Sequence, residues 1–300
     1  MIKGVPASLS IEPTTNCNLQ CPECPSGLRQ FTRKIGNIDF TLYKSIIDQS
    51  YKELVYLMLY FQGEPLLHPD FFEMLKYAKS KNIYTATSTN AHFLDYESAK
   101  NVVKSGLDRL IISIDGVSQE SYEKYRKGGD LNKVLEGTRN LLKVKNELKS
   151  TKPYIIFQFV VFKSNENEIQ EIKILGRQIG VDEVKIKSAQ FYNLDLSNDL
   201  IPTKNEYLRY KRSQNDFSFK DTTPNKCWKS WHSSVITMDG KLVPCCFDKD
   251  AKYKLGDLIE NSIKDIFSGD KSNTFRKQIL IDRKQIDICR NCSEGIKVFK

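Results

Sequence analysis

Three cysteines near the start of the chain have the spacing that most clearly predicts chemistry. Cys17, Cys21 and Cys24 stand in the run CNLQCPEC, directly after the strand-like residues 7–12. Three thiolates in one loop can bind three irons of a 4Fe-4S cluster and leave the fourth iron open to an external ligand. Structural zinc is the alternative, but zinc prefers a fourth Cys or His nearby, and all three histidines of the chain are distant in the sequence. The spacing therefore favours a cluster with one reactive iron.

Five further cysteines lie near the end of the chain. Cys227, Cys245, Cys289 and Cys292 would suffice to bind every iron of a second 4Fe-4S cluster, and Cys246 could replace Cys245. Such a closed cluster would carry electrons. A four-cysteine zinc ribbon is the alternative, because Cys-x2-Cys with distant partners is also a zinc spacing.

The residues between these two groups alternate between strand-like and helix-like runs. Strands are predicted at residues 7–12, 54–61, 83–88, 108–114, 154–162 and 183–188, and helices at 40–52, 71–80, 96–105, 131–148 and 166–179. This alternation is typical of a parallel sheet, whose chemistry gathers at the carboxyl ends of the strands. The cysteine loop follows the first predicted strand, and polar motifs follow the next three.

Those motifs give the chain a family resemblance. They are Gly63-Glu64-Pro65, Thr89-Asn90-Ala91, Ser113-Ile114-Asp115-Gly116 and Arg126 within YRKG. With the cysteine spacing, they make residues 8 to 188 resemble the radical S-adenosylmethionine (SAM) superfamily. The C-terminal cysteines resemble the SPASM and shorter twitch modules that follow the barrel domain in members of this superfamily.

The resemblance implies an α/β fold, with an open six-step (β/α)6 partial TIM barrel followed by a small cysteine-rich SPASM/twitch-like domain. We expect the barrel at residues 1–190, a connecting segment at 191–225 with a helix-like run at 204–212, and the auxiliary cluster domain at 226–300. Asp239-Gly240 between apolar runs predicts a β-hairpin in the last domain.

The resemblance also implies roles in binding SAM. SAM would chelate the open iron through its amino and carboxylate groups. Glu64, preceded by Gly63 in its motif, would accept hydrogen bonds from the amino group. Arg126 would fix the carboxylate, because a planar guanidinium suits a two-oxygen anion. Asn90 and Ser113 would serve the carboxylate or the ribose, although polar groups at strand ends are commonly just solvated.

Three positions depart from the family pattern. Glu23 stands before the third cysteine, where the family usually has an aromatic residue, which puts adenine contact from that side in doubt. Gln62 and Ala91 each replace a glycine, so the backbone there has less freedom. Neither replacement removes a ligand.

Some aromatic and polar residues have no assigned role in the site. Nothing in the sequence separates structural from substrate-binding roles for Gln158, Lys185 and Lys187. Trp228 and Trp231, beside the first C-terminal cysteine, are expected to shield the auxiliary cluster. The strand aromatics are expected to be core: Tyr56, Tyr60, Phe61, Phe157, Phe159 and Phe162.

Composition excludes several classes of protein. With 300 residues and 40% hydrophobic content, the chain can build a core without disulfides. It has no secretory signal and no apolar run of about 20 residues, so we expect reduced thiols in the cytoplasm and no membrane partner. The net charge of +9 comes from scattered lysines, which does not favour nucleic acid and leaves an acidic small molecule or acidic peptide compatible.

The hypothesis for function is a radical SAM oxidoreductase. It would cleave SAM reductively to a 5'-deoxyadenosyl radical and abstract a hydrogen atom. The result would be dehydrogenation of a hydroxylated small molecule, with an electron passed to the auxiliary cluster. A flavodoxin- or ferredoxin-type protein would supply electrons. No catalytic base is assigned.

Two alternatives remain open. The first is a maturase that modifies a ribosomally made peptide; the barrel begins within about ten residues of Met1, which leaves no room ahead of it for a peptide-binding domain of ordinary size. The second is a non-enzymatic iron-sulfur or zinc-ribbon protein, which would not need Glu64 or Arg126 around an open iron.

Overall fold

The computed structural model describes residues 3–191, 198–213, 217–219 and 224–294. Its main sheet has nine strands in the order β11-β10-β9-β1-β2-β3-β4-β5-β6. The six strands from β1 to β6 are parallel, as predicted: β1 (Ser8–Ile11), β2 (Tyr56–Met58), β3 (Tyr84–Thr89), β4 (Arg109–Ser113), β5 (Tyr154–Val161) and β6 (Glu183–Ser188).

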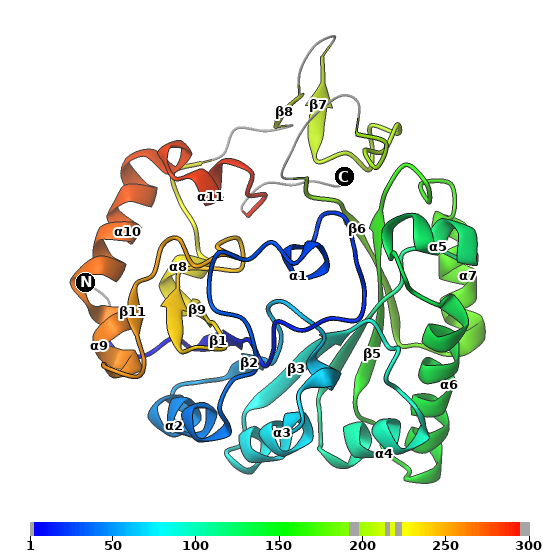
Figure 1. The fold of residues 1–300 in the computed structure, drawn as a ribbon, viewed down its shortest axis with the longest axis horizontal. Coiled ribbons are helices and arrows are strands. Elements are labelled where there is room, and N and C mark those ends of the chain that lie inside the picture. The colour runs from blue at the N-terminus through cyan, green and yellow to red at the C-terminus, as the bar shows by residue number, and fades with distance from the viewer. Residues whose placement is uncertain (1–2, 192–197, 214–216, 220–223, 295–300) are drawn as a thin grey trace.

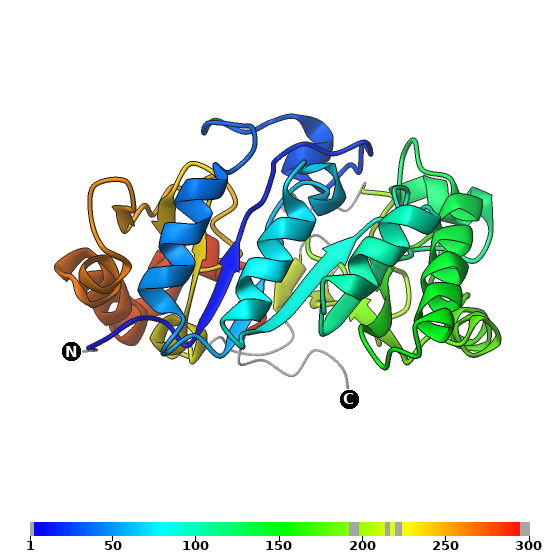
Figure 2. The same cartoon turned by 90° about the horizontal axis from the view of Figure 1, so that it is seen from below.

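Helices follow the strands on the outer side of the sheet (Figures 1 and 2). The five long predicted helices are all present: α2 (Phe40–Ser50), α3 (Phe71–Ser80), α4 (Tyr96–Lys104), α6 (Leu131–Glu147) and α7 (Ile169–Ile179). The sequence did not reveal three short elements, which are α1 (Pro25–Leu28), η1 (Pro65–Leu67) and α5 (Gln119–Tyr125). Each has fewer than eight residues, which is too short for a helical period to show.

The main hydrophobic core lies between the sheet and this outer layer of helices. Side chains alternate across each strand, so every second residue packs outward. Leu9, Leu57 and Phe157 are fully buried in this core. The alternate residues of the same strands, such as Met58 and Gln158, face the inner, concave side of the sheet. Figure 1 looks onto the carboxyl ends of the strands, with the blue cysteine loop lying over them.

The C-terminal region extends the same sheet. The predicted hairpin is present as β9 (Ser233–Ile236) and β10 (Lys241–Val243), and β10 pairs with β11 (Gly256–Asp257). β9 also pairs with β1 in parallel register, from Ser8 opposite Ser233 to Ile11 opposite Ile236. The sequence did not reveal this pairing. The rest of the region is helical: α8 (Lys229–His232), α9 (Ile263–Ser268), α10 (Asp270–Asp282), η2 (Arg283–Gln285) and α11 (Asp287–Arg290).

The expected helix at 204–212 is wrong. These residues form turns and then β7 (Tyr210–Arg212), which pairs antiparallel with β8 (Phe217–Phe219). Leu208 and Tyr210 are buried with Phe191 in a small separate cluster, while the residue between them is only half-buried. This alternation with period two suits a strand. No helix among the described residues is long and apolar enough to cross a membrane.

Candidate active site

The cysteine loop lies over the carboxyl ends of the first strands, and two predicted SAM-binding residues reach its thiols. Asn90 Nδ2 lies 3.9 Å from Cys17 Sγ, and Arg126 Nη1 lies 4.0 Å from Cys21 Sγ. Asn90 follows β3 and Arg126 follows α5, so the fold brings together residues more than 70 positions apart. The structure therefore gathers both side chains at the cysteine loop.

The thiols of this loop are partly withdrawn from water. Burial raises the pKa of Cys17 to about 12, and the nearby Glu64, Cys24 and Cys21 add to the rise. Such thiols become thiolates only when a strong positive charge lies beside them, as a metal centre provides. Within the described part of the chain, no three Cys, His, Asp or Glu side chains converge closely enough to hold a single metal ion.

The loop after β2 packs directly against the cysteine loop. Gly63 has a φ of +73°, and a Cβ there would lie 2.3 Å from the carbonyl oxygen of Thr14. Its amide donates to Ser26 Oγ at 3.0 Å. Next to it, Cys24 Sγ lies 4.0 Å from Gln62 Oε1. A glycine is therefore required at Gly63 by both its backbone angle and the lack of space, whereas Gln62, in place of the other glycine, fills a position beside a thiol.

Glu64 is a buried carboxylate that joins two strand ends. Its oxygens accept hydrogen bonds from the Thr89 hydroxyl and the Asn90 amide, each at 2.7 Å, and from the Leu66 amide at 3.2 Å. Burial raises the pKa of Glu64 to about 7, and these hydrogen bonds oppose the rise. A carboxylate has about four acceptor positions, so these three bonds leave capacity for an amino group of a ligand.

Arg126 has a protein partner that the sequence analysis did not single out. Its Nε donates to Asp115 Oδ2 at 2.6 Å, and Asp115 is fully buried. Asp115 also accepts from the Val160 amide at 2.7 Å. Burial raises the pKa of Asp115, and the Arg126 guanidinium opposes that rise. Asp115 therefore positions the guanidinium, and its place directly after β4 in the motif was the available signal.

Asn90 and Ala91 form the turn after β3. Asn90 Nδ2 donates to Asn18 Oδ1 at 2.8 Å, which ties this turn to the cysteine loop. Ala91 has a φ of +64°, in the left-handed region where the family pattern has glycine. A non-glycine residue there costs about 1 to 2 kcal/mol. The backbone thus keeps the glycine-like conformation that the sequence analysis expected to be harder to reach.

Ser113 and Tyr60 both face the inner side. Ser113 ends β4, and among the described residues its hydroxyl has no hydrogen-bond partner. Tyr60 is half-buried; burial and the nearby Cys24 raise its pKa, while Arg126 opposes the rise. Expecting Tyr60 to be core was therefore wrong, because it follows β2 on the same face as the half-buried Met58. Tyr56 is likewise half-buried, whereas the four phenylalanines are buried as expected: Phe61, Phe157, Phe159 and Phe162.

A buried ion pair ties the cysteine loop to the C-terminal region. Arg33 binds Glu12 through both terminal nitrogens, at 2.7 and 2.6 Å. Glu12 also accepts from the Met238 amide at 3.0 Å, and Arg33 Nε donates to the Lys249 carbonyl at 2.8 Å. Asp250 accepts from the Arg33 amide at 3.3 Å. Short-range sequence patterns could not reveal the contacts to Met238, Lys249 and Asp250, since each of these spans more than 200 residues.

The C-terminal cysteines gather at the other side of the opening. Burial raises the pKa of Cys245, and Cys292 and Cys289 are near enough to raise it further. Cys227 in turn is near enough to raise the pKa of both Cys289 and Cys292. Cys246, the neighbour of Cys245, is an exposed residue; desolvation of its thiol raises its pKa, and the nearby Lys229 and Lys249 oppose the rise. The choice between Cys245 and Cys246 as the ligand stays a prediction.

A buried arginine lies beside these thiols. Arg283 is fully buried, and its Nη1 donates to the carbonyl oxygens of Lys226 and Glu294 at 2.9 Å each. Its Nε and Nη2 are buried without a hydrogen-bond partner among the described residues. Burial raises the pKa of Cys289 to about 11, and the Arg283 guanidinium opposes that rise. Two unpaired buried donors next to cysteines fit an anionic sulfur-rich group, since leaving them unpaired is costly.

The two tryptophans differ from their expected role. Trp228 is 75% exposed, so it does not cover the cysteines. Trp231 is half-buried and lines a hollow of about 460 Å³ together with Cys227. Trp228, which directly precedes α8, lines the same hollow but leaves most of its surface to solvent, so the expectation was wrong for Trp228.

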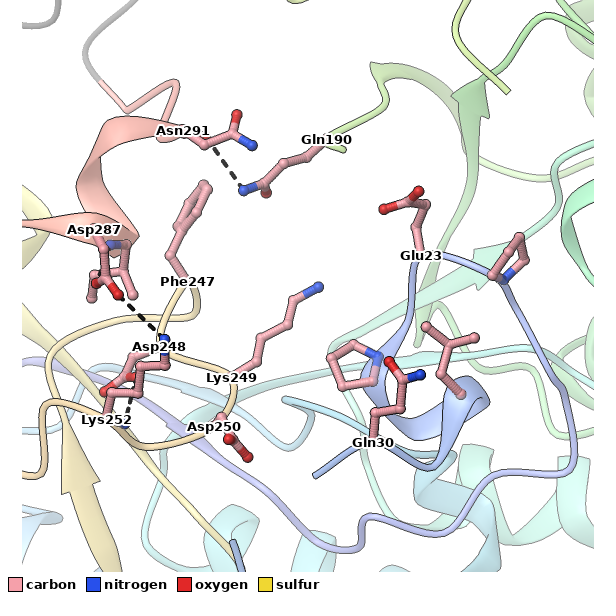
Figure 3. Close-up of a pocket in the computed structure, with 14 residues that line it drawn as sticks. Glu23, Gln30, Gln190, Phe247, Asp248, Lys249, Asp250, Lys252, Asp287 and Asn291 are labelled. Atoms are coloured by element: carbon pink, nitrogen blue, oxygen red, sulfur yellow. Dashed lines mark hydrogen bonds and ion pairs between the residues drawn. The ribbon is translucent and has the colours of Figure 1, made fainter. Parts of the chain in front are cut away.

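A cavity of about 520 Å³ opens between the two groups of cysteines (Figure 3). Glu23 lines it from the cysteine loop, and Asn291 and Phe247 line it from the C-terminal region. Gln190, which follows β6, donates to the Asn291 carbonyl at 3.3 Å across its margin. Glu23, in place of the family's aromatic, thus faces this cavity. The remaining lining residues are Pro22, Pro25, Leu28, Gln30, Asp248, Lys249, Asp250, Lys252, Asp287 and Ile288.

The comparisons with known proteins agree with this arrangement. Residues 11–173 match the radical SAM superfamily, and residues 227–293 match the SPASM iron-sulfur cluster-binding domain. The chain belongs to the radical SAM superfamily and carries a C-terminal SPASM domain. Its cofactors are therefore a 4Fe-4S cluster with SAM, and auxiliary iron-sulfur binding in the SPASM domain. The iron-sulfur domain match favours a cluster over a zinc ribbon at the C-terminal cysteines.

Two curated relatives span most of the chain. A tungsten-containing aldehyde ferredoxin oxidoreductase cofactor-modifying protein from Pyrococcus furiosus is 27% identical over 95% of this chain and 86% of its own. A PqqA peptide cyclase from Gluconobacter oxydans is 26% identical over 80% of this chain and 70% of its own.

Solved structures share the fold. Streptococcus suis SuiB bound to precursor peptide SuiA has a TM-score of 0.70 at 16% identity, covering 98% of this chain and 72% of that one. Native anSMEcpe with bound AdoMet has a TM-score of 0.69 at 18% identity, covering 98% and 92%. BtrN in complex with AdoMet and 2-DOIA has a TM-score of 0.61 at 18% identity, covering 98% and 95%.

Proposed function

We propose that this radical SAM enzyme modifies a peptide made on the ribosome. The similarity to a PqqA peptide cyclase over 80% of the chain is the observation that carries the proposal. SuiB, whose fold is similar, is bound to a precursor peptide. The order of preference among the sequence hypotheses is thus reversed, since peptide modification was the alternative there.

The barrel residues have separate tasks in this proposal. Cys17, Cys21 and Cys24 hold the cluster, which with SAM supplies a radical that abstracts a hydrogen atom. Glu64 accepts from the amino group of SAM, with Gly63 keeping the loop close to the cysteines. Arg126, positioned by Asp115, binds the SAM carboxylate.

Two polar groups complete this SAM site. Asn90, between the thiol of Cys17 and Asn18, fixes the turn beside the cluster. Ser113 directs its hydroxyl to the inner side, where it serves SAM or the substrate. Both roles extend the predictions made from the sequence.

The cavity between the cysteine groups gives the substrate a place. Its volume of about 520 Å³ lies within the range of about 300–1,000 Å³ common for ligand sites. Residues next to Cys245, Cys289 and Cys292 line one side of it, and residues of the barrel loop line the other. A peptide segment held there would lie between the cysteines that would hold the barrel cluster and those that would hold the auxiliary cluster, and the auxiliary cluster would supply an electron acceptor.

Oxidation of a hydroxylated small molecule is the second candidate. The likeness to BtrN in complex with 2-DOIA favours it, but at 18% identity that likeness concerns the fold alone. A flavodoxin- or ferredoxin-type electron donor remains a prediction for either candidate.

The test uses the reconstituted enzyme with SAM, dithionite and a short peptide encoded beside its gene. We expect one 5'-deoxyadenosine for each modified peptide, with the mass change located to a residue by tandem mass spectrometry. The matched reaction contains an aminocyclitol in place of the peptide. Oxidation of the aminocyclitol with an unchanged peptide would contradict the proposal and support the second candidate.

A further inference from the structure

The last parallel strand, β6, has two faces of different character. Val184 and Ile186 pack against the main core on the outer side. The fit there is tight, because a Cβ on Gly176 of α7 would lie 2.3 Å from Val184 Cγ2. Strand alternation therefore turns Lys185 and Lys187 to the inner side. Both lysines are exposed, so the inner concavity of the sheet is open at this point.

The sheet register aligns Lys185 with two other polar side chains. Ser113 of β4 lies opposite Gln158 of β5, and Gln158 lies opposite Lys185 of β6. Among the residues that the structure describes, the side chains of Ser113 and Gln158 make no hydrogen bond to protein. Lys187 is opposite Val160, one step closer to the strand ends where the cysteines lie. Ser113, Gln158 and Lys185 thus form a polar row across three adjacent strands.

Lys187 makes no ion pair within the described part of the chain. Partial desolvation of its ammonium group lowers its pKa, the nearby Lys185, Lys229 and Arg209 lower it further, and Glu183 opposes the shift. Arg209 Nη2 donates to the Ser188 carbonyl at 3.4 Å. Lys229, on α8 of the SPASM domain, is also close to Cys246 and Cys292. Lys187 therefore lies where the barrel and the auxiliary cysteines face each other.

Two carboxylates pair with other lysines of this region. Glu183 shares the inner face of β6 and lies 3.9 Å from Lys185, while Glu294 lies 2.8 Å from Lys229. Among the residues that the structure describes, neither carboxylate makes an ion pair with Lys187. The ammonium group of Lys187 is therefore open to a carboxylate of the substrate.

We propose that the inner face of β6 binds carboxylate side chains of the substrate, so that the enzyme acts on an acidic peptide. Lys187 holds a glutamate or aspartate of that peptide, and Gln158 and Ser113 donate hydrogen bonds to its neighbouring backbone or side chain. The inference rests on the proposed function and deepens it by naming the substrate class. Gln190, three residues after Lys187, lines the cavity between the two cysteine groups. That lining has four carboxylates and two lysines, so the acidic side chains of the peptide are held at β6 and not in the cavity.

Lysines on an edge strand also have a structural role. β6 is the last strand of its sheet, and lysines on edge strands discourage pairing with other chains. That role concerns the association state of the protein. It makes no difference between acidic and neutral peptides, so the two roles are separable by experiment.

The test measures binding of fluorescein-labelled hexaglutamate by anisotropy to the reconstituted enzyme with SAM. Hexaglutamine is the neutral matched peptide. We expect Lys187→Gln to weaken hexaglutamate binding about tenfold, the loss of one charge-assisted contact. Lys173→Gln is the control, because Lys173 is exposed on α7 at the outer side and its loss changes net charge equally.

Each outcome decides a different point. Equal losses for Lys187→Gln and Lys173→Gln, or equal binding of both peptides, would overturn the inference. Aggregation of Lys187→Gln with unchanged hexaglutamate affinity would favour edge protection instead. Free glutamate that competes as strongly as the hexamer would contradict a peptide and indicate a small acid. Formation of 5'-deoxyadenosine without substrate is measured alongside, so that failure of the SAM chemistry is distinguished from failure of this substrate class.

Discussion

Glu64 lies at the junction of the cysteine loop, β2 and β3. Its carboxyl is uncharged below its pKa of about 7 and charged above it. Only the charged form attracts the amino group of SAM strongly. If Glu64 binds SAM as proposed, the charge state of this one buried side chain sets how firmly the enzyme holds SAM near neutral pH.

This state predicts a pH dependence for SAM binding. We expect Glu64→Gln to bind SAM about tenfold or more weakly than wild type at pH 8, and the difference to shrink toward pH 6, where the wild-type carboxyl becomes neutral. The dissociation constants come from the change that SAM makes in the spectrum of the cluster. Titration of the SAM amino group affects both proteins equally. A ratio of the two constants that stays the same from pH 6 to pH 8 would contradict this role.

Arg283 gives a second prediction at the scale of one residue. Its two unpaired buried donors lie beside Cys289 and Cys292 and would donate to cluster sulfur. Hydrogen bonds and positive charge near a cluster raise its reduction potential. We therefore expect Arg283→Met to lower the potential of the auxiliary cluster in an EPR-monitored titration, and Arg283→Lys to restore part of it.

Arg276 provides the matched control for Arg283. It is also buried in the SPASM domain, but it donates to the carbonyl oxygens of Ser230 and Phe267 at 2.9 and 2.8 Å. Arg276→Met should therefore leave the potential unchanged in protein that retains its iron. An equal shift in both variants would mean that general loosening of the domain, not Arg283, sets the potential.

The loop after β2 packs closely against the cysteine loop at Gly63. Gly63→Ala places a methyl group against the Thr14 carbonyl, within the cysteine loop. We expect this variant to lose iron from the barrel site and to bind SAM poorly. Gly128→Ala is the comparison, because Gly128 has a similar φ of +76° but open space around its Cβ position. It should cost only about 1 to 2 kcal/mol of stability and keep its iron. Similar iron contents in the two variants would refute the close packing described here.

The Arg33–Glu12 pair connects the cysteine loop, β1 and the loops around β10. Arg33→Met leaves a buried carboxylate without its partner, so we expect a loss of about 3 to 5 kcal/mol in urea unfolding. Glu12→Gln/Arg33→Met removes the charge but keeps an acceptor for the Met238 amide. This double variant should recover a large part of the loss. A double variant as unstable as Arg33→Met would show that the charge of Glu12 is not the cause.

The sequence predicted where the helices and strands lie better than it predicted which elements pack against one another. The six parallel strands and five long helices had clear periods and were found at about the expected residues. The segment 204–212 was mistaken for a helix because its burial depends on Phe191, which lies outside the segment. The pairing of β9 with β1 could not be foreseen, because it joins residues more than 200 positions apart.

The site was predictable to a similar degree. Motif spacing identified Glu64, Asn90 and Arg126, and the structure brings all three to the cysteine loop. It could not identify Asp115 as the partner of Arg126, or Arg283 beside the auxiliary cysteines. Those assignments depend on burial and on contacts between distant elements, which no local pattern contains.

At the scale of the whole molecule, one sheet carries both groups of cysteines. β1 leads into the first cysteine loop, and its parallel neighbour β9 belongs to the SPASM domain. Figure 1 shows this domain beside the first strands, facing β6 across the opening. The boundaries at 190 and 225 remain predictions from the sequence. The shared sheet fixes the distance between the two cysteine groups.

The central claim is that the barrel cysteines hold a SAM-cleaving cluster and the SPASM cysteines hold an auxiliary one. The most direct measurement is iron and sulfide content with 5'-deoxyadenosine formation after anaerobic reconstitution, for wild type and for Cys17→Ala/Cys21→Ala/Cys24→Ala. We predict about eight irons per chain in wild type and about four in the triple variant, which forms no 5'-deoxyadenosine. About four irons in wild type with zinc retained, or 5'-deoxyadenosine from the triple variant, would contradict the account.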